Sequence, residues 1–193
     1  MIEFLEEIDR AIVVAVNSCN SPFLDELMWW VSGKITWIPL YILLLFLGFK
    51  HFDRITFVKF IIFVVAAVAI TDLVSVHLFK NVFLRYRPSH HLELMDRLHF
   101  YETEPGEFYK GGKYGFVSSH AANFFAITMA CLLAFRGHYV YLRWLLPSVG
   151  ILVCFSRIYL GVHYLSDVLA GAAVGAFVAW ILHRLWFRGV IKN

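Results

Sequence analysis

Residues 56–79 read TFVKFIIFVVAAVAITDLVSVHLF, and this stretch decides the class of fold. It is long enough to cross the hydrocarbon core of a bilayer as a helix, which takes about 20 mainly apolar residues. The rest of the chain agrees with this interpretation, because 60% of its residues are hydrophobic and only 16% are charged. Soluble domains are about half apolar and about a quarter charged. We therefore expect an integral membrane protein.

Further apolar stretches predict a bundle around this helix. The clearest lie at 118–135, 141–157 and 163–187, and a shorter one lies at 35–49. Residues 1–33 form two weaker helical pieces, of which the first has an acidic and an apolar face. We expect this part to lie at the membrane interface, with a hairpin that enters the membrane as the alternative. The predicted fold is an all-α, polytopic transmembrane helix bundle with five or six membrane helices and an N-terminal interfacial helix.

The longest polar stretch, 88–116, contains several glycines and prolines and is too polar to be buried in lipid. A loop of this length is usually functional or disordered. The formal net charge of +3 is too small to indicate a nucleic-acid partner. The length fits one compact unit, so we interpret 1–193 as a single membrane-embedded domain of unknown oligomeric state.

Two cations close the first membrane stretch. Lys80 is followed by Arg87 and Pro88 in KNVFLRYRP. If the helix continues this far, Lys80 and Arg87 lie on nearly the same face, roughly 10 Å apart along the axis. Such a pair suits a phosphate group, because lysine supplies a point charge and arginine a bidentate fork. Taken alone, the pair fits equally well two anchors that snorkel to the membrane surface.

A second polar cluster, Ser118-Ser119-His120, stands where the next apolar stretch begins. A helix N-terminus offers unpaired N–H groups and the positive end of the helix dipole, which together bind anions. His120 adds a group that can donate a proton near neutral pH. The alternative is that the serines only cap the helix.

The third cluster lies in SRIYLGVHYLSD, in which Arg157 ends one apolar stretch while His163 and Asp167 begin the next. On a helix, residues four apart share a face. A carboxylate there can accept a hydrogen bond from one imidazole nitrogen and leave the other nitrogen free as a nucleophile. The alternative is a polar pair that satisfies itself at a helix end. Because successive helices cross in opposite directions, all three clusters are expected at one membrane face.

With these clusters, the chain resembles the type 2 phosphatidic acid phosphatase family, which is related to the vanadium-dependent haloperoxidases. The family signature is Lys-x6-Arg-Pro, then Pro-Ser-Gly-His, then Ser-Arg-x5-His-x3-Asp. The first and third parts are complete here, in Lys80-x6-Arg87-Pro88 and Ser156-Arg157-x5-His163-x3-Asp167. The second part departs from the pattern, because Val117 and Ser119 replace the proline and the glycine. The resemblance covers about 56–187, which we interpret as the catalytic core.

The resemblance implies a role for each matching residue. His163 would attack phosphorus and Asp167 would fix its tautomer, while His120 would protonate the leaving oxygen and then activate water. The phosphate oxygens would be held by the other signature residues: Lys80, Arg87, Ser118, Ser119 and Arg157. A phosphohistidine intermediate of this kind needs no metal and no cofactor, and no carboxylate cluster suited to Mg²⁺ is expected near these residues.

Other polar residues in unusual places are expected to be structural. Asp72 lies inside the first membrane stretch, where an acid must face protein or water. We expect it to bond a neighbouring helix or to support the cationic site. His90, His91 and His99 lack the spacing of metal ligands and are interpreted as surface residues.

The expected function is hydrolysis of a lipid-linked phosphate in a membrane. Undecaprenyl diphosphate is the preferred substrate, with phosphatidylglycerophosphate, phosphatidic acid and lipid A phosphates as alternatives. A lipid phosphotransferase and a membrane protein with a degenerate, inactive site are the rival interpretations. Lys and Arg gather on the side opposite the motifs, and cytoplasmic loops are enriched in these residues. We therefore expect a bacterial inner membrane protein whose active site faces the periplasm or exterior.

Overall fold

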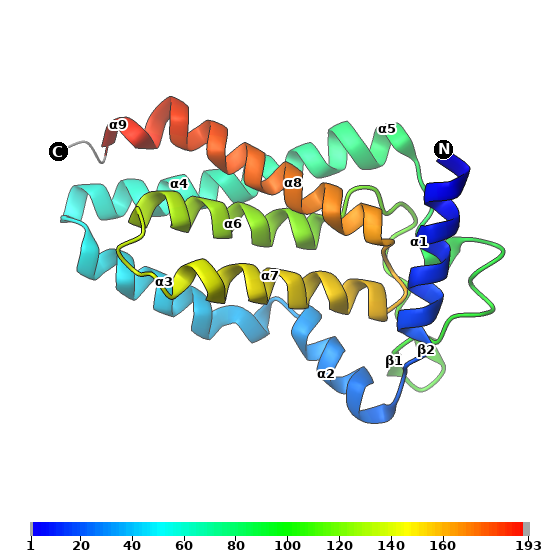
Figure 1. The fold of residues 1–193 in the computed structure, drawn as a ribbon. Coiled ribbons are helices and arrows are strands. Elements are labelled where there is room, and N and C mark those ends of the chain that lie inside the picture. The colour runs from blue at the N-terminus through cyan, green and yellow to red at the C-terminus, as the bar shows by residue number, and fades with distance from the viewer. Residues whose placement is uncertain (1, 191–193) are drawn as a thin grey trace.

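The computed structural model describes residues 2–190, in which helices run side by side along one axis (Figure 1). The main helices of this bundle are α3 (Ile38–His51), α4 (Arg54–Val74), α6 (Ser119–Phe135), α7 (Leu142–Tyr159) and α8 (Leu165–Leu182). Two of them continue through a wider turn into a short last helix: η2 (Ser75–Lys80) and α5 (Asn81–Phe83) after α4, and η4 (His183–Phe187) and α9 (Arg188–Val190) after α8. The prediction of a helix bundle is confirmed.

Length and composition identify the membrane-crossing helices. Within the described residues, three are long and apolar enough to cross a bilayer alone: Arg54–Phe83, Leu142–Tyr159 and Leu165–Val190. A fourth crossing results if Pro22–Ser32 and Ile35–His51, bent by 69° at the break between them, count as one broken span. Helix α6 is apolar but has only 17 residues, and it packs against α4, α7 and α8. Helix α6 is therefore short but well covered by its neighbours, with nine of its 17 residues buried.

Helices α6 and α8 make the most extensive contact in the bundle, and glycines on α8 allow it. A Cβ atom on Gly175 would overlap the backbone carbonyl of Ala122, and one on Gly171 would crowd the carbonyl of Ser118. Small residues let membrane helices approach until their backbones touch. Since the obstacle in both places is backbone, the two helices have little freedom to shift, and the start of α6 is fixed beside the start of α8.

The largest apolar core lies toward the other end of the bundle. Four buried phenylalanines from α4, α6 and η4 meet there: Phe60, Phe63, Phe135 and Phe187. The rings of Phe63 and Phe187 stack with their centroids 4.7 Å apart. This packing anchors the ends of the helices remote from the three polar clusters, which leaves the opposite end of the bundle for polar chemistry.

The N-terminal third divides into two parts. Helix α1 (Ile2–Asn17) lies across one end of the bundle, against α7 and α8 (Figure 1). Helix α2 (Pro22–Ser32) instead packs beside α7 and leads through η1 (Ile35–Trp37) into α3. The arrangement of α1 agrees with an interfacial helix, whereas α2 belongs to the side of the bundle. Residues 1–33 therefore do not form one interfacial part. Helix α1 lies across the end of the bundle and α2 lies along its side, and the polar break before Pro22 divides them.

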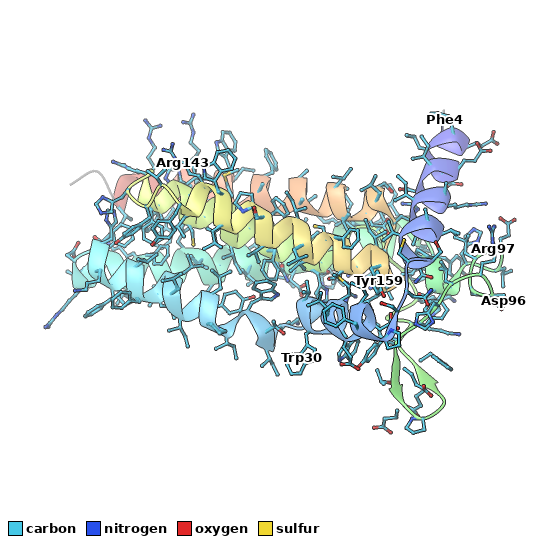
Figure 2. All side chains as sticks on the ribbon, turned by 60° about the horizontal axis from the view of Figure 1, so that its bottom comes forward. Phe4, Trp30, Asp96, Arg97, Arg143 and Tyr159 are labelled. Carbon is cyan, nitrogen blue, oxygen red and sulfur yellow. The ribbon has the colours of Figure 1, made fainter. Side chains whose placement is uncertain are left out.

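The polar stretch 88–116 covers the same end of the bundle as α1. It contains η3 (Pro88–His90) and a small antiparallel hairpin of β1 (Glu102–Glu104) and β2 (Glu107–Phe108), which the sequence analysis did not predict. Asn17 joins this stretch to α1 and α7, because its side-chain amide donates to the carbonyls of His99 at 2.7 Å and Tyr159 at 2.8 Å. Figure 2 shows Asp96 and Arg97 of this stretch at the end opposite Arg143.

Replacing Gly175 by valine should destabilise the bundle by forcing α6 and α8 apart. Overpacking a tight contact costs about 1–3 kcal/mol, and more where the obstacle is backbone. Thermal unfolding of the purified protein in detergent should show a clearly lower midpoint for Gly175→Val. The matched control is Gly112→Val, since a Cβ at Gly112 meets nothing within 4 Å. Equal midpoints for the two variants would contradict the close approach of the helices.

Candidate active site

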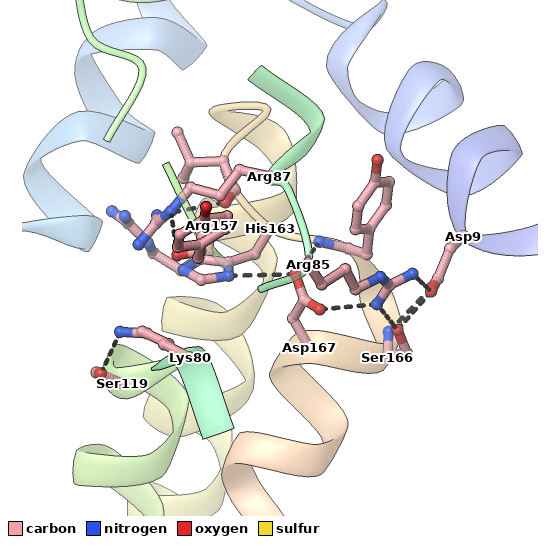
Figure 3. A network of polar contacts seen from close by, with 12 residues as sticks. Asp9, Lys80, Arg85, Arg87, Ser119, Arg157, His163, Ser166 and Asp167 are labelled. Carbon is pink, nitrogen blue, oxygen red and sulfur yellow. Dashed lines mark hydrogen bonds and ion pairs between the residues drawn. The ribbon is translucent and has the colours of Figure 1, made fainter. Parts of the chain in front are cut away.

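The three polar clusters meet at the end of the bundle that α1 and the polar stretch cover. Lys80 comes from the end of η2, Ser119 from the start of α6, and Arg157 from the last turn of α7. His163 stands in the turn between α7 and α8, and Asp167 in the first turn of α8. Figure 3 shows these side chains converging from separate elements. Each cluster is thus positioned by a helix end.

His163 is the most enclosed of these groups, with 1% of its surface exposed. Its Nδ1 lies 3.4 Å from Oδ2 of Asp167, and that oxygen also accepts the backbone N–H of Tyr164 at 3.0 Å. The sequence analysis placed both residues on one helical face, but α8 begins only at Leu165. The pair therefore spans the N-terminal cap of the helix. Such a contact orients the ring and leaves Nε2 directed away from Asp167.

Two arginines lie beside the His163 ring, as Figure 3 shows. Burial, followed by repulsion from Arg87 and Arg157, holds the pKa of His163 well below its usual range. The imidazole is therefore neutral at pH 7, and with Nδ1–H directed to Asp167 its Nε2 carries a lone pair. Burial and the nearby Arg157 also lower the pKa of Arg87 to about 10, so Arg87 remains charged at pH 7.

Each arginine is held by groups outside its own cluster. Arg87 donates from Nε to the carbonyl of Tyr114 at 3.1 Å and from Nη1 to that of Val162 at 3.3 Å. Arg157 donates from Nη2 to the hydroxyl of Tyr109 at 2.9 Å and from Nη1 to Ser32. These contacts fix both guanidinium groups before any ligand arrives, which lowers the cost of ordering them on binding.

Lys80 and Arg87 do not share a helical face, contrary to the expectation from their spacing. Helix α5 ends at Phe83, and Leu84 adopts a left-handed conformation with φ 48°. Arg87 then lies in an extended segment, where its backbone N–H donates to the carbonyl of Lys113 at 3.1 Å. The chain turn before the proline, rather than the helical period, brings Arg87 to the site.

The start of α6 supplies hydroxyl and amide groups. Lys80 donates from Nζ to Oγ of Ser119 at 2.6 Å, and Ser119 is also 2.7 Å from Oγ of Ser75. Ser118 is the N-cap residue of α6, and its backbone N–H donates to the carbonyl of Asp167 at 3.0 Å. The Ser118 hydroxyl makes no capping hydrogen bond, so capping does not explain the serines: Ser119 binds the Lys80 cation, and the backbone of Ser118 joins two helix starts.

Several buried polar atoms at this site have no partner within residues 2–190: Nε2 of His163, Oγ of Ser118 and Nε of Arg157. Buried polar groups are nearly always hydrogen-bonded, so their clustering calls for a ligand or ordered water. With two arginines and a lysine around them, the ligand that fits is a tetrahedral oxyanion. An oxyanion bound here can be attacked by a neutral imidazole.

His120 approaches the site from the first turn of α6, one residue beyond Ser119. It lines a cavity of about 300 Å³ together with Asp72, Asn123 and Lys34. Asn123 donates from Nδ2 to Oδ1 of Asp72 at 3.4 Å, so Asp72 contacts a neighbouring helix as expected. His120 thus lines an open cavity, whereas His163 is almost fully enclosed.

Sequence reasoning missed one residue pair at this site, Arg85 and Asp9. Arg85 donates from Nη1 to Oδ1 of Asp167 at 2.8 Å and from Nη2 to Oδ2 of Asp9 at 2.8 Å. Asp9 also accepts the backbone N–H of Ser166 at 2.9 Å. Arg85 stands between Lys80 and Arg87, so a third cation in that stretch was a visible signal. Its partner Asp9, on α1, gave no such signal, because the two residues lie far apart in sequence.

Of the three histidines in the polar stretch, His99 lies outside the site. It pairs with Asp25 at 3.0 Å, and its side chain is 43% exposed. Among the described residues, no group of three or more His, Cys, Asp or Glu side chains is arranged to hold a metal ion. The independence from metal remains a prediction, and the residues that converge here are cations, histidines and one carboxylate.

Comparison with known proteins gives one family model and two similar lipid phosphatases. Residues 36–190 match the model of the PAP2 superfamily. A lipid A 4′-phosphatase of Porphyromonas gingivalis is 34% identical over 96% of this chain and 75% of its own length. A lipid A 4′-phosphatase of Bacteroides thetaiotaomicron is 33% identical over 97% of this chain and 83% of its own.

The fold is also that of a solved membrane protein. The crystal structure of a transmembrane PAP2-type phosphatidylglycerolphosphate phosphatase from Bacillus subtilis superposes with a TM-score of 0.70 and 21% identity. The match covers 98% of this chain and 88% of that one. The family model and the two relatives confirm the resemblance drawn from the three motifs, and this chain belongs to the PAP2 superfamily as a membrane lipid phosphatase.

Proposed function

We propose that this enzyme hydrolyses a phosphate monoester on the sugar headgroup of a lipid A-type glycolipid and releases inorganic phosphate. The observation that carries the chemistry is the buried Nε2 of His163, which has no partner within residues 2–190 and lies beside Arg87 and Arg157 while Nδ1 contacts Asp167. The choice of substrate is supported by the two relatives, both named as lipid A 4′-phosphatases.

In the first step, Nε2 of His163 attacks phosphorus and the bond from phosphorus to the lipid oxygen breaks. His120 gives its proton to that oxygen, so the lipid leaves as an alcohol. Asp167 holds the imidazolium that forms and fixes its tautomer, the role of the carboxylate in catalytic triads. The product of this step is a phosphohistidine at His163 and an unprotonated His120.

In the second step, His120 takes a proton from a water molecule whose oxygen attacks the phosphohistidine. The bond from phosphorus to Nε2 breaks and inorganic phosphate leaves, which restores both histidines. The phosphate oxygens are held throughout by the cations and hydroxyls around them: Lys80, Arg87, Arg157, Ser118 and Ser119. Donors already fixed in position stabilise the charge that develops in each transition state.

Undecaprenyl diphosphate, the substrate preferred from sequence, has no support from the relatives, whose names point to a sugar phosphate instead. A phosphotransferase would use the same phosphohistidine and pass the phosphate to a second lipid. Release of inorganic phosphate from the glycolipid, without an acceptor lipid, distinguishes hydrolysis from transfer.

Replacing each histidine should stop the reaction at a different step. His163→Ala should abolish phosphate release, because no nucleophile remains. His120→Ala should slow it by about 10²–10⁴-fold, the usual contribution of a general acid and base. It should also trap acid-labile phosphate on the protein, provided that the leaving group is an activated one such as 4-nitrophenol. Phosphate release and radiolabelled phosphoprotein would both be measured.

The matched control is His183→Ala, which removes a buried histidine at the other end of the bundle. It should keep the wild-type rate of phosphate release per folded molecule. Wild-type activity in His163→Ala, or labelled protein that survives that substitution, would disprove the assigned nucleophile.

Arg85 and Asp9 are proposed as positioning residues, because they reach the substrate site only through Asp167. Arg85→Met should lower kcat by about tenfold or more, equivalent to about 1.4 kcal/mol of transition-state stabilisation, with little change in KM. Asp9→Asn should show the same pattern more weakly. The control is Arg10→Met, since its exposed pairs with Glu6 and Glu93 contribute little.

A purely structural role of Arg85 would lower the melting temperature and leave kcat per folded molecule unchanged. Arg85→Lys is the informative second variant, because it retains a cation but cannot bridge two carboxylates as the guanidinium does. We expect it to recover part of kcat. Full loss of kcat in Arg10→Met as well would contradict the specific role of Arg85.

We also propose that the site faces the periplasm of a bacterial inner membrane. Figure 2 shows Arg143 at one end of the bundle and Arg97 at the other. The end with Arg143 carries further cations, with Asp53 as its acid: Lys50, Arg54, Lys59, Arg136, Arg184 and Arg188. The sequence predicts Lys192 at this end too, but it lies outside the described residues. Cytoplasmic ends are enriched in Lys and Arg, which favours this orientation.

The orientation predicts which introduced cysteine an impermeant thiol reagent will label in intact spheroplasts. Gly112→Cys, in the polar stretch, should be labelled, whereas His138→Cys, at an exposed position close to Arg136, should be labelled only after lysis. Cys19 is exposed at the site end and must first be changed to serine. The reverse labelling pattern would place the site in the cytoplasm.

A further inference from the structure

We propose that Asn123 and Asp72 form a subsite for hydroxyl groups of the leaving lipid, so that the enzyme selects a sugar as the leaving group. The subsite is the polar end of the cavity of about 300 Å³ that His120 lines. This inference rests on the proposed role of His120 as the general acid. It gives Asp72, expected from sequence to be structural, a part in substrate recognition.

The chemistry of the transfer fixes where the leaving group must lie. Nucleophile and leaving oxygen stand on opposite sides of phosphorus, roughly in line. If His163 attacks from its enclosed pocket, the leaving oxygen points away from it and toward the group that protonates it. A proton donor must lie within hydrogen-bond reach of that oxygen. The leaving lipid therefore occupies the space beside His120, and that space is this cavity.

Two polar side chains of the cavity, Asn123 and Asp72, lie further from the phosphate site than His120 does. Asn123 follows His120 by nearly one turn of α6, which is about 5 Å along the helix axis. Its Oδ1 is buried and has no partner in the part of the chain that the structure describes. Its Nδ2 makes only a 3.4 Å contact to Asp72. Both residues thus keep hydrogen-bonding capacity for a ligand.

Asp72 is the only ionisable residue of α4 after Lys59. An ionisable residue inside a membrane helix faces protein or a water-filled cavity and commonly marks a functional site. The acid accepts hydrogen bonds and the amide both donates and accepts them. A sugar hydroxyl next to the phosphorylated carbon could donate to Asp72 and accept from the second N–H of Asn123 Nδ2, whose other N–H contacts Asp72.

Beyond this polar end the space becomes apolar. A second cavity, of about 190 Å³, shares Tyr41 and Ile127 with the first and continues between α3, α4 and α6. Its remaining lining is apolar throughout: Leu44, Leu45, Phe60, Ile61, Val64, Val65 and Cys131. Hydroxyl-binding groups near the phosphate followed by an apolar section suit an acylated sugar. They suit a polyprenol less, because its alcohol carries no neighbouring hydroxyl group.

The competing explanation is that Asn123 and Asp72 only hold α4 and α6 together. Polar pairs between membrane helices are worth about 0.6–2 kcal/mol, so their loss would lower stability. It would not change the preference for one leaving group over another. Selectivity therefore separates the two explanations.

The test compares kcat/KM for two substrates in the same detergent micelles. One is an acylated glucosamine disaccharide that carries a 4′-phosphate, and the other is farnesyl phosphate. For Asn123→Leu, the ratio of the sugar substrate to the prenyl substrate should fall about tenfold, which corresponds to about 1.4 kcal/mol for the lost hydrogen bond. Asp72→Asn should lower the same ratio.

The matched control is Thr71→Val, which removes a neighbouring buried hydroxyl that has no partner within residues 2–190 and does not line the cavity. Its ratio should equal that of the wild type. An unchanged ratio in both Asn123→Leu and Asp72→Asn would overturn the subsite. Failure of the proposed function has a different signature, since wild-type enzyme would then release no phosphate from the sugar substrate.

Discussion

The burial of one carboxylate, Asp167, governs the arrangement of the active end. A buried charge is tolerated only when it is paired and hydrogen-bonded. Asp167 is fully enclosed, and its two oxygens contact Arg85, the N–H of Tyr164 and the ring of His163. Every group that satisfies the carboxylate is thereby placed at a set distance from the imidazole of His163, so the electrostatic requirement also sets the geometry.

Asp167 acts through its backbone as well. Its carbonyl accepts the N–H of Ser118, which ties the start of α8 to the start of α6. The glycine contacts further along α8 keep the two helices in that register. Because the helix starts cannot slide against each other, the hydroxyl of Ser118 and the imidazole of His163 keep their spacing. Packing in the bundle interior and polar contacts at its end therefore support the same arrangement.

The features predictable from sequence were those with a local signal. Hydropathy located the long helices, and three spaced motifs identified the superfamily and the residues that converge at one end. Features that depend on the path of the chain were missed: the turn at Leu84 that replaces a continuing helix, the hairpin β1–β2 and the separation of α2 from α1. The contact between Arg85 and Asp9 was missed because a salt bridge between distant segments leaves no periodic pattern. The substrate was not determined, since a cavity between helices has no signature in the order of residues.

The polar stretch 88–116 covers one end of the bundle, and both site arginines depend on it. The carbonyl of Tyr114 holds Arg87, and the hydroxyl of Tyr109 holds Arg157. In protein engineering, this segment is therefore not an interchangeable module. Chimeras that exchange it between relatives would alter catalytic speed together with any change in substrate range, whereas residues lining the space between α3, α4 and α6 can be varied without disturbing either guanidinium.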